Sequence, residues 1–343
     1  MSLKIINQPD LLPFIERMMN DYEVIGPVAN DTGFRFATLT AASQVRMDYN
    51  TTVLPPRKAL LPTHETLFSF RSDMHTVTPA FDMKWRVLLG VHTCDLHALC
   101  MLDEAFARSQ PDAHYMKRRA TTAIISLECL TPCDEHSFCK SMNTLTATSG
   151  FDLHLTALGE FYAVDVGTTA GESLLANYAK THEATRAEIA LLDKAMSQKW
   201  AKFPTRLHLD GKDLPALMGI SYKSPLWEEI GKRCLACGSC NIVCPTCYCF
   251  DVRDEISLDG KVGERYRVWD SCQLDEFARI GSGENFRKTR AQRLRHRFMR
   301  KGKYIAEAFL GQQGCVGCGR CARACLVDIT PVDVWNSLHK DHT

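Results

Sequence analysis

The sequence contains no long apolar run. No segment approaches the ~20 apolar residues that a membrane-spanning helix needs, and the N-terminal MSLKIINQPDLLPF lacks the apolar core of an export signal. Charge is balanced as well, because 41 Lys and Arg residues stand against 40 Asp and Glu residues. Such a balance favours neither nucleic acid nor a membrane surface as a partner. We therefore expect a soluble, cytoplasmic protein.

Nucleotide-binding signatures are also missing. No Gly-x-Gly-x-x-Gly follows a predicted strand, and the chain has no phosphate-binding P-loop. We expect that this chain binds neither flavin nor nicotinamide. If it takes part in redox chemistry with NADH or NADPH, another protein must supply the flavin and the nucleotide site.

Cysteine, in contrast, is abundant, with 16 residues in a chain of 343. Disulfide frameworks are typical of small secreted domains, and buried free thiols behave as small apolar side chains. Half of the cysteines here fall into two short runs that share one internal spacing. Neither disulfide bonding nor core packing explains such a repeat, so the runs indicate metal binding.

Both runs have the spacing C-x2-C-x2-C-x3-C, which is typical of 4Fe-4S ferredoxins. The first run comprises Cys234, Cys237, Cys240 and Cys244, and the second comprises Cys315, Cys318, Cys321 and Cys325. In ferredoxins with two clusters, the fourth cysteine of each run binds the other cluster. We therefore predict one 4Fe-4S cluster on Cys234, Cys237, Cys240 and Cys325, and a second on Cys315, Cys318, Cys321 and Cys244.

Zinc is the alternative metal for closely spaced cysteines. A structural zinc ion usually takes two separate C-x2-C halves, which differs from the continuous spacing seen here. Pro245 follows the first run as expected, whereas Leu326 stands where proline normally follows the second. This departure weakens the second run only slightly, because proline is not a ligand.

Four further cysteines follow predicted strands in the N-terminal part. The apolar patterns predict strands over 86–90 and 123–127 with a helix over 96–106 between them, which is a β-α-β unit. Neighbouring strands end at the same edge of a sheet, so the residues after them meet there. A third 4Fe-4S cluster is our hypothesis for this edge, and partly buried thiols are the alternative. Its ligands would be Cys94, Cys129, Cys133 and Cys139.

These patterns predict two domains. Residues 1–205 should form a mixed α/β domain, with a hairpin over 151–156 and 161–165 and helical spacing between 171 and 200. Residues 206–343 should form a mostly α-helical, ferredoxin-like domain that holds two 4Fe-4S clusters.

The remaining cysteines and one basic stretch allow more than one interpretation. We favour a packing role for Cys100, Cys247, Cys249 and Cys272, although the last three could be extra ligands or a redox-active thiol set. Residues 286–303 contain nine Lys or Arg residues. This stretch could be a solvated helical face, could offset cluster charge or could dock an acidic partner, and nucleic-acid binding is the less favoured interpretation.

Several motifs together resemble the iron–sulfur beta subunit of soluble, NAD(P)-linked nickel–iron hydrogenases of the sulfhydrogenase type, and the related electron-transfer subunit of anaerobic sulfite reductase. They are Leu-Leu-Gly-Val-His-Thr-Cys-Asp-Leu ending at Leu96, Phe-Cys-Lys-Ser-Met ending at Met142, Gly-Phe-Asp-Leu-His-Leu from Gly150, Cys-Pro-Thr-Cys-Tyr-Cys-Phe-Asp-Val-Arg-Asp-Glu from Cys244, and Asn-Phe-Arg from Asn285 with the Arg-rich stretch after it. Members of this family commonly have Cys-Phe-Cys before the Ser-Met, whereas Ser137 precedes Phe138 here. The resemblance implies that Cys133 could replace the missing cysteine.

The resemblance implies an electron-transfer protein that binds two or three 4Fe-4S clusters. It would relay electrons between the catalytic subunit of a hydrogenase or, as the alternative, of an anaerobic sulfite reductase and a flavin NAD(P)H-oxidoreductase subunit. It would not itself be catalytic. Two rivals of other classes are a thiol- or sulfur-active redox enzyme and a nucleic-acid enzyme with structural clusters.

Overall fold

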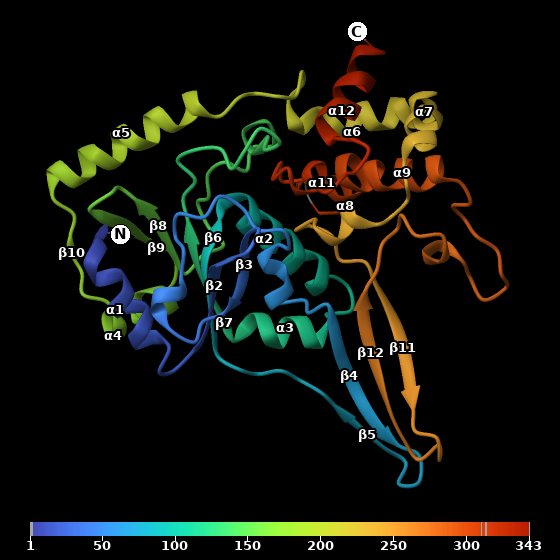
Figure 1. Cartoon of the computed structure of the whole chain (residues 1–343), viewed down its shortest axis with the longest axis horizontal. Helices are drawn as coiled ribbons and strands as arrows, with labels where there is room; N and C mark the ends of the chain where they lie inside the picture. Colours follow the sequence, from blue (N-terminus) through green and yellow to red (C-terminus); the bar gives the residue numbers. More distant parts are fainter. Residues whose placement is uncertain (1–2, 310, 313, 343) are drawn as a thin grey trace.

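The computed structural model describes residues 3–309, 311–312 and 314–342 (Figure 1). Eight strands form the larger sheet, in the order β10-β1-β9-β8-β7-β6-β2-β3. Their bounds are β1 Lys4–Asn7, β2 Glu23–Asn30, β3 Gly33–Thr38, β6 Arg86–His92, β7 Thr122–Leu127, β8 Leu153–Ala157, β9 Phe161–Val166 and β10 His182–Glu183.

The centre of this sheet is parallel, and its margins are antiparallel. Strands β2, β6, β7 and β8 run parallel to one another, and β3, β9, β1 and β10 are added antiparallel on the two sides. The predicted β-α-β unit is confirmed as β6, α2 (Thr93–Ala107) and β7. All seven residues of β6 are buried, as expected for a strand covered on both faces. The predicted hairpin is confirmed as β8 and β9.

Helices cover the sheet and bury its main apolar core. Helix α2 packs on β6 and β7 beside α3 (Ala113–Ala120), while α1 (Gln8–Met18) and α4 (Thr169–Tyr178) contact each other and the strands β1 and β9. The helical pattern between 171 and 200 proves to be α4 and the longer α5 (Arg186–Lys202). Thr185 and Glu188 form a capping box at the start of α5, which satisfies free backbone N–H groups there. The N-terminal half is therefore mixed α/β, as predicted.

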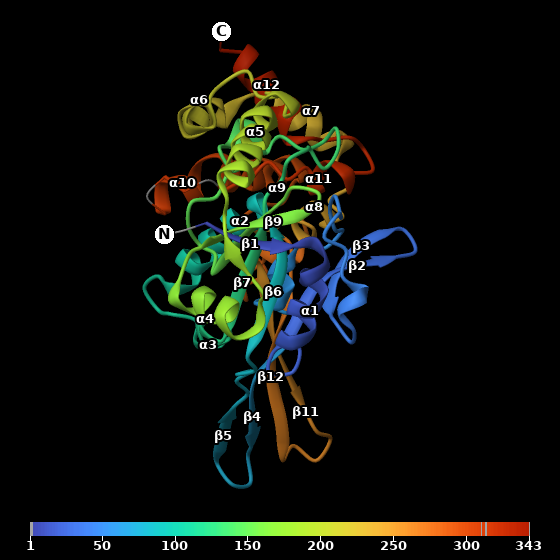
Figure 2. The same ribbon diagram turned by 90° about the vertical axis from the view of Figure 1, so that its left-hand side faces the viewer.

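A smaller sheet joins parts of the chain that are distant in sequence. Strands β4 (His64–Arg71) and β5 (Thr76–Pro79) pair with each other, β4 pairs with β12 (Val262–Trp269), and β12 pairs with β11 (Phe250–Ile256). Figure 2 shows this sheet as an arm that extends away from the rest of the molecule. Within it, Arg267 of β12 donates to Glu65 of β4 at 2.6 Å, and both side chains are buried. The prediction of a mostly helical C-terminal part thus missed the β11–β12 hairpin. Buried and exposed residues do not alternate regularly along its two strands.

Outside this hairpin, the C-terminal part contains short helices joined by irregular segments. Short helices pack around a second apolar core that contains Trp227, Phe298 and Trp335. Their bounds are α6 Leu214–Ile220, α7 Leu226–Arg233, α8 Ser239–Ile242, α9 Arg290–Met299, α10 Ile305–Ala308, α11 Arg320–Arg323 and α12 Pro331–Lys340. A π-helical turn, Arg300–Tyr304, continues α9.

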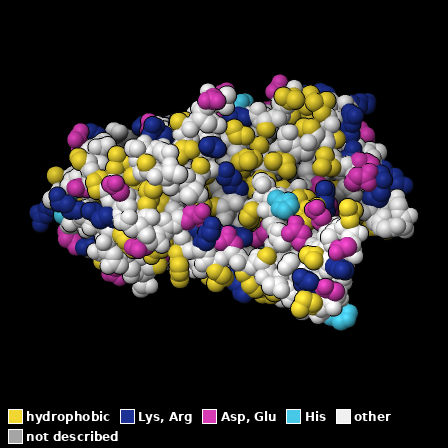
Figure 3. Space-filling view, turned by 60° about the horizontal axis from the view of Figure 1, so that its bottom comes forward, with side chains coloured by type: hydrophobic (Ala, Val, Ile, Leu, Met, Phe, Trp, Pro, Cys, Tyr) yellow, Lys and Arg dark blue, Asp and Glu magenta, His cyan; other side chains and the backbone are white. Residues whose placement is uncertain are grey.

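Two surface properties bear on partners. No helix in the described part of the chain is long and apolar enough to span a membrane. Figure 3 shows a face on which Lys and Arg side chains are interspersed with Asp and Glu, with apolar side chains between them. This mixture agrees with the balanced composition.

Candidate iron–sulfur sites

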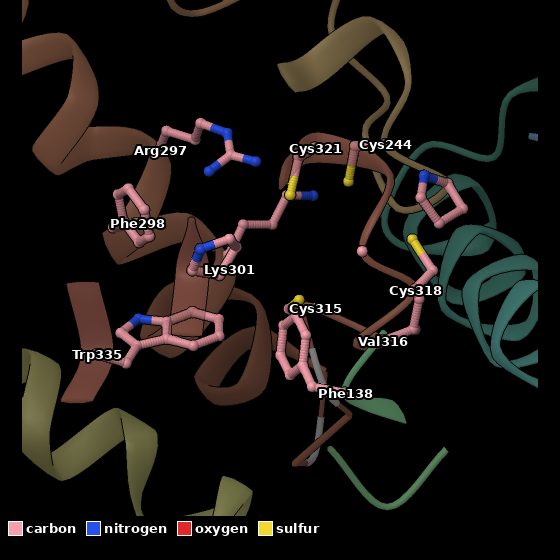
Figure 4. Close-up of a pocket in the computed structure, with 13 residues that line it drawn as sticks. Phe138, Cys244, Arg297, Phe298, Lys301, Cys315, Val316, Cys318, Cys321 and Trp335 are labelled. Carbon is pink, nitrogen blue, oxygen red and sulfur yellow. The ribbon is translucent and has the colours of Figure 1, made fainter. Parts of the chain in front are cut away.

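Four cysteines from both runs surround one cavity, which we call cavity A. Cys315, Cys318 and Cys321 of the second run lie opposite Cys244 of the first run, and all four line the cavity together with Phe138 and Trp335. Figure 4 shows their sulfur atoms directed toward a common space. This is the set that the spacing predicted for one 4Fe-4S cluster, and four thiols around one cavity suit the donor set of such a cluster.

The local backbone explains how three thiols of the second run converge. Gly317 and Gly319 have φ angles of +68° and +73°, a region that favours glycine. Both lie against the segment that precedes Cys139, since a Cβ on Gly317 would come within 2.6 Å of the Cys139 backbone nitrogen. A larger residue at Gly317 would therefore be strained twice, by its φ angle and by this contact.

The other predicted set lines a second cavity, cavity B. Cys234, Cys237, Cys240 and Cys325 surround it, with Gln273, Leu294, Arg297 and Phe298 in the wall. Backbone N–H groups approach two of the sulfurs, because Ala236 N lies 3.4 Å from Cys234 Sγ and Ile329 N lies 3.3 Å from Cys325 Sγ. Such donors stabilise negative charge on sulfur. Each cavity is thus lined by three cysteines of one run and the fourth cysteine of the other, and the two ligand sets stay predictions.

Cavities A and B are neighbours. Arg297 and Phe298 of α9 line both of them. The two cavities differ in their access to solvent, because Cys237 of cavity B is exposed whereas the Cys244 side of cavity A is buried. The neighbouring Leu235 and Leu326, which also line cavity B, are 50% and 81% exposed.

The structure also brings together the four N-terminal cysteines, which we call the Cys94 group: Cys94, Cys129, Cys133 and Cys139. Cys94 lies in the first turn of α2, Cys129 follows β7, and Cys139 begins a short 3-10 helix, Cys139–Met142. Cys94 and Cys139 pack in one small buried cluster with Cys129 and with Cys318 of cavity A. Burial, followed by the charge of the neighbouring Cys133, raises the pKa of Cys139 to about 12. Burial likewise raises the pKa of Cys133 to about 11, although nearby arginine side chains oppose this.

Raised thiol pKa values have a consequence for metal loading. Burial also raises the pKa of Cys240 and of Cys318 to about 12. Without a metal, these thiols keep their protons at neutral pH. A metal ligand must be a thiolate, so cluster assembly has to release protons from these sites.

A buried ion pair fixes the Cys94 group against cavity A. Arg320 of α11 donates to both carboxylate oxygens of Asp95, at 2.6 and 2.7 Å, and its Nε donates to the Thr52 carbonyl at 2.8 Å. Asp95 follows Cys94, and Arg320 lies between Cys318 and Cys321. Removing one partner of such a buried pair typically costs about 3–5 kcal/mol, so this pair holds two cysteine-bearing segments in place.

The basic stretch proves to be partly internal. The stretch as a whole has the composition of a polar surface. Three of its cations, spaced four residues apart, are nevertheless buried: Arg293, Arg297 and Lys301. Lys301 Nζ lies 2.6 Å from Thr246 Oγ1, and that oxygen lies 3.3 Å from Cys244 Sγ. Burial alone would lower the pKa of Arg297, but the charges of nearby cysteines, Cys240 first, raise it well above its usual value. Of the roles suggested for this stretch, Arg297 and Lys301 fit the offsetting of cluster charge.

One cation near cavity A escaped the sequence analysis. Arg57 is buried, donates from Nε to the Cys244 carbonyl at 2.9 Å, and lies over the Trp269 ring at 3.5 Å from its centroid. Arg57 and Cys244 are 187 residues apart in the chain. No spacing pattern connects them, so only the fold reveals the contact.

The last four cysteines divide into two kinds. Cys100, on α2, packs beside Gly150, where an added Cβ would come within 2.4 Å of its sulfur. Cys247, Cys249 and Cys272 instead line a common cavity. Within the described residues, no three Cys, His, Asp or Glu side chains form a group that could hold a single metal ion. The ligands of a 4Fe-4S cluster bind different iron atoms and need only surround a shared space.

Comparison with known proteins identifies the class of domain that contains these cavities. Residues 233–329 match the family model of the 4Fe-4S dicluster domain. The C-terminal part is therefore a 4Fe-4S dicluster domain, as the two cysteine runs predicted.

A relative that covers nearly the whole chain identifies its protein family. It is 33% identical over 328 residues to sulfhydrogenase 2 subunit beta of Pyrococcus furiosus, which covers 95% of this chain and 95% of that protein. The chain belongs to the sulfhydrogenase beta subunit family, and the resemblance seen in its motifs is confirmed. No solved structure matches it.

Proposed function

We propose that this chain is the electron-transfer subunit of a soluble hydrogenase complex. It relays electrons between the catalytic subunit of that complex and a flavin NAD(P)H-oxidoreductase subunit. The observation that carries the proposal is the contact between cavities A and B, each lined by four cysteines, with the Cys94 group packed against cavity A. When bound, 4Fe-4S clusters supply one-electron redox chemistry.

The arrangement supports an electron-transfer path that runs from cavity B through cavity A to the Cys94 group. Cavity B lies near the surface, because Cys237 is exposed beside the exposed Leu235 and Leu326. We assign this apolar rim to contact with one partner protein of the complex, since exposed apolar side chains next to a redox site favour close docking. The Cys94 group lies at the other end of the path, beyond cavity A, and would hold a third 4Fe-4S cluster on Cys94, Cys129, Cys133 and Cys139.

The residues of this chain have distinct tasks in the relay. Cysteines of the two runs hold the clusters, and backbone N–H groups near Cys234 and Cys325 stabilise sulfur charge. Arg297 and Lys301 offset the negative charge that arrives with each electron, and they do so from buried positions where solvent does not screen them. The two predicted domains, 1–205 and 206–343, divide these tasks between the Cys94 group and the dicluster part.

The partner is proposed from the relative alone. Pyrococcus furiosus sulfhydrogenase 2 subunit beta is named as part of a hydrogenase. This favours a hydrogenase over an anaerobic sulfite reductase as the enzyme that the present chain serves, in the cytoplasm.

The experiment that tests the proposal compares two kinds of electron donor. The anaerobically purified chain should be bleached by dithionite in the visible absorption of its clusters, but NADH and NADPH should leave it unchanged, because a flavin must split the hydride electron pair into single electrons. Adding the flavin subunit of the same complex should restore reduction by the nucleotide. Rapid reduction of the isolated chain by NADH or NADPH would contradict the proposal.

A further inference from the structure

Three cysteines outside the cluster cavities share a cavity of their own, which we call cavity C. Cys247, Cys249 and Cys272 line it together with Asn241, Arg300 and Lys301. Cys247 and Cys272 are buried, whereas Cys249 is half-buried and so more accessible. Side-chain hydrogen bonds with Cys247 and Cys272, followed by burial, raise the pKa of Cys249 well above its usual range, so Cys249 is the protonated, central thiol of the group.

The chain geometry favours one pair among the three. Cys249 immediately precedes β11, and Cys272 follows β12, so the two residues flank the base of one hairpin. The backbone N–H of Asp270 donates to the Cys249 carbonyl at 3.0 Å, which holds the two segments side by side. Cys247 and Cys249 are separated by one residue, and a disulfide between them would close a small, strained ring.

We propose that Cys249 and Cys272 form a dithiol–disulfide redox site that reacts with small anionic disulfides. Cations in the wall of cavity C, from Arg297, Arg300 and Lys301, would attract the anionic groups of such a substrate. The Asn241 side-chain amide lies 3.0 Å from Cys272 Sγ and stabilises negative charge on that sulfur. The hydrogen bond with Cys249 lowers the pKa of Cys272 to about 7, although burial acts in the opposite direction.

The exchange balances without a further reactant. The Cys249 sulfur attacks one sulfur of the disulfide R–S–S–R while its proton passes to the Cys272 thiolate, which releases R–S⁻ and leaves R bound to Cys249 through a mixed disulfide. The Cys272 sulfur then attacks Cys249 and displaces the second R–S⁻, which takes the proton as R–SH. Two cysteines are thereby oxidised to one disulfide, and the substrate disulfide is reduced to two thiols. This site stands apart from the proposed electron relay, because its reaction needs no cluster.

Disulfide mapping of the full-length chain tests the inference. The anaerobically purified protein is treated with oxidised glutathione, its remaining thiols are alkylated, and its peptides are analysed by mass spectrometry. We expect a peptide pair linked by Cys249 and Cys272, the loss of two free thiols per chain and no loss of iron. A link between Cys247 and Cys249 instead, or no internal link at all, would overturn the assignment.

Three variants sharpen the test. Cys272→Ser removes both the group that accepts the Cys249 proton and the second thiol, so it should form no internal disulfide and should add glutathione to Cys249 only slowly, whereas Cys249→Ser should form no internal disulfide. Cys100→Ser is the matched control, because Cys100 packs on α2 away from cavity C, and its product should equal that of the unmodified chain. Loss of a whole cluster's iron in Cys249→Ser would show that these cysteines are cluster ligands and would refute the proposal.

Discussion

Replacing Arg297 by glutamine should lower the reduction potentials of both C-terminal clusters. Arg297 is buried, lines cavities A and B, and is hydrogen-bonded to Cys321. Figure 4 shows its guanidinium group directed toward the cysteines of cavity A. A buried positive charge stabilises the reduced, more negative form of each cluster, so its removal makes each cluster harder to reduce.

The size of the shift follows from Coulomb's law. At a separation of roughly 8 Å and an effective dielectric constant of about 20, a unit charge contributes about 2 kcal/mol. For a one-electron couple, this corresponds to roughly 90 mV. Glutamine keeps a donor that can reach the Asn241 oxygen, which Arg297 Nε contacts at 3.1 Å, so the variant mainly tests the charge.

Redox titration followed by electron paramagnetic resonance measures this effect. Lys301 lines cavity A but not cavity B. Lys301→Gln should therefore lower only one of the two reduction potentials, that of the cluster in cavity A. Arg295→Gln is the matched control, because Arg295 lies on the same helix but stacks on Tyr222 at 4.2 Å and lines neither cavity. Equal shifts in Arg295→Gln and Arg297→Gln, with iron content unchanged, would refute the assignment of Arg297 to cluster charge.

Three further predictions concern the ligands and the surrounding structure. Cys318→Ser and Cys237→Ser should each lose about four iron atoms from a different C-terminal cluster, measured by iron and sulfide analysis; a variant that keeps every cluster signal would contradict the ligand sets. Cys94→Ser and Cys129→Ser should lose one and the same further cluster while dithionite still reduces the other two, and full iron content in both would show that the N-terminal cysteines bind none. Lys199→Met should lower the free energy of unfolding by about 3 kcal/mol in denaturant titrations, because it leaves Glu128 buried without the Lys199 Nζ contact at 2.5 Å. Adding Glu128→Gln should recover part of that loss, and a double variant as unstable as the single one would count against the ion pair.

The grouping of the cysteines around cavities A and B was predictable because its information is local. Each C-x2-C-x2-C-x3-C run has two residues with positive φ, which are Gly317 and Gly319 in the second run and Ala236 and Gly238 in the first, so three of these four positions are glycine. The exchange of the fourth cysteine follows a general rule for two-cluster domains, and cavities A and B have the cysteines that the rule requires. The β-α-β unit was equally clear, because β6 is buried along its whole length.

The surroundings of these cavities were not predictable, because they depend on contacts between distant residues. Arg297 and Lys301 have the same residue types as Arg295 and Lys303 beside them, and only the packing of α9 and the turn after it decides which of them are buried. Arg57 is far from every cysteine run in the sequence. The hairpin β11–β12 was missed because most of its residues are exposed or half-buried on both faces, so they lack the alternating burial that marks a strand.

These distant contacts connect the N-terminal part to cluster binding. Arg57 donates to the carbonyl of Cys244, Asp95 pairs with Arg320 between two cysteines of the second run, and β4 pairs with β12. Each contact joins a residue before position 130 to a segment that carries or borders candidate ligands. Removing either partner of a buried polar contact lowers the free energy of unfolding, whether that partner lies in the N-terminal or the C-terminal part. The two parts of the chain therefore stabilise each other. Cluster assembly in the C-terminal part should therefore depend on the folding of the N-terminal part, even for the clusters whose ligands all lie beyond residue 233.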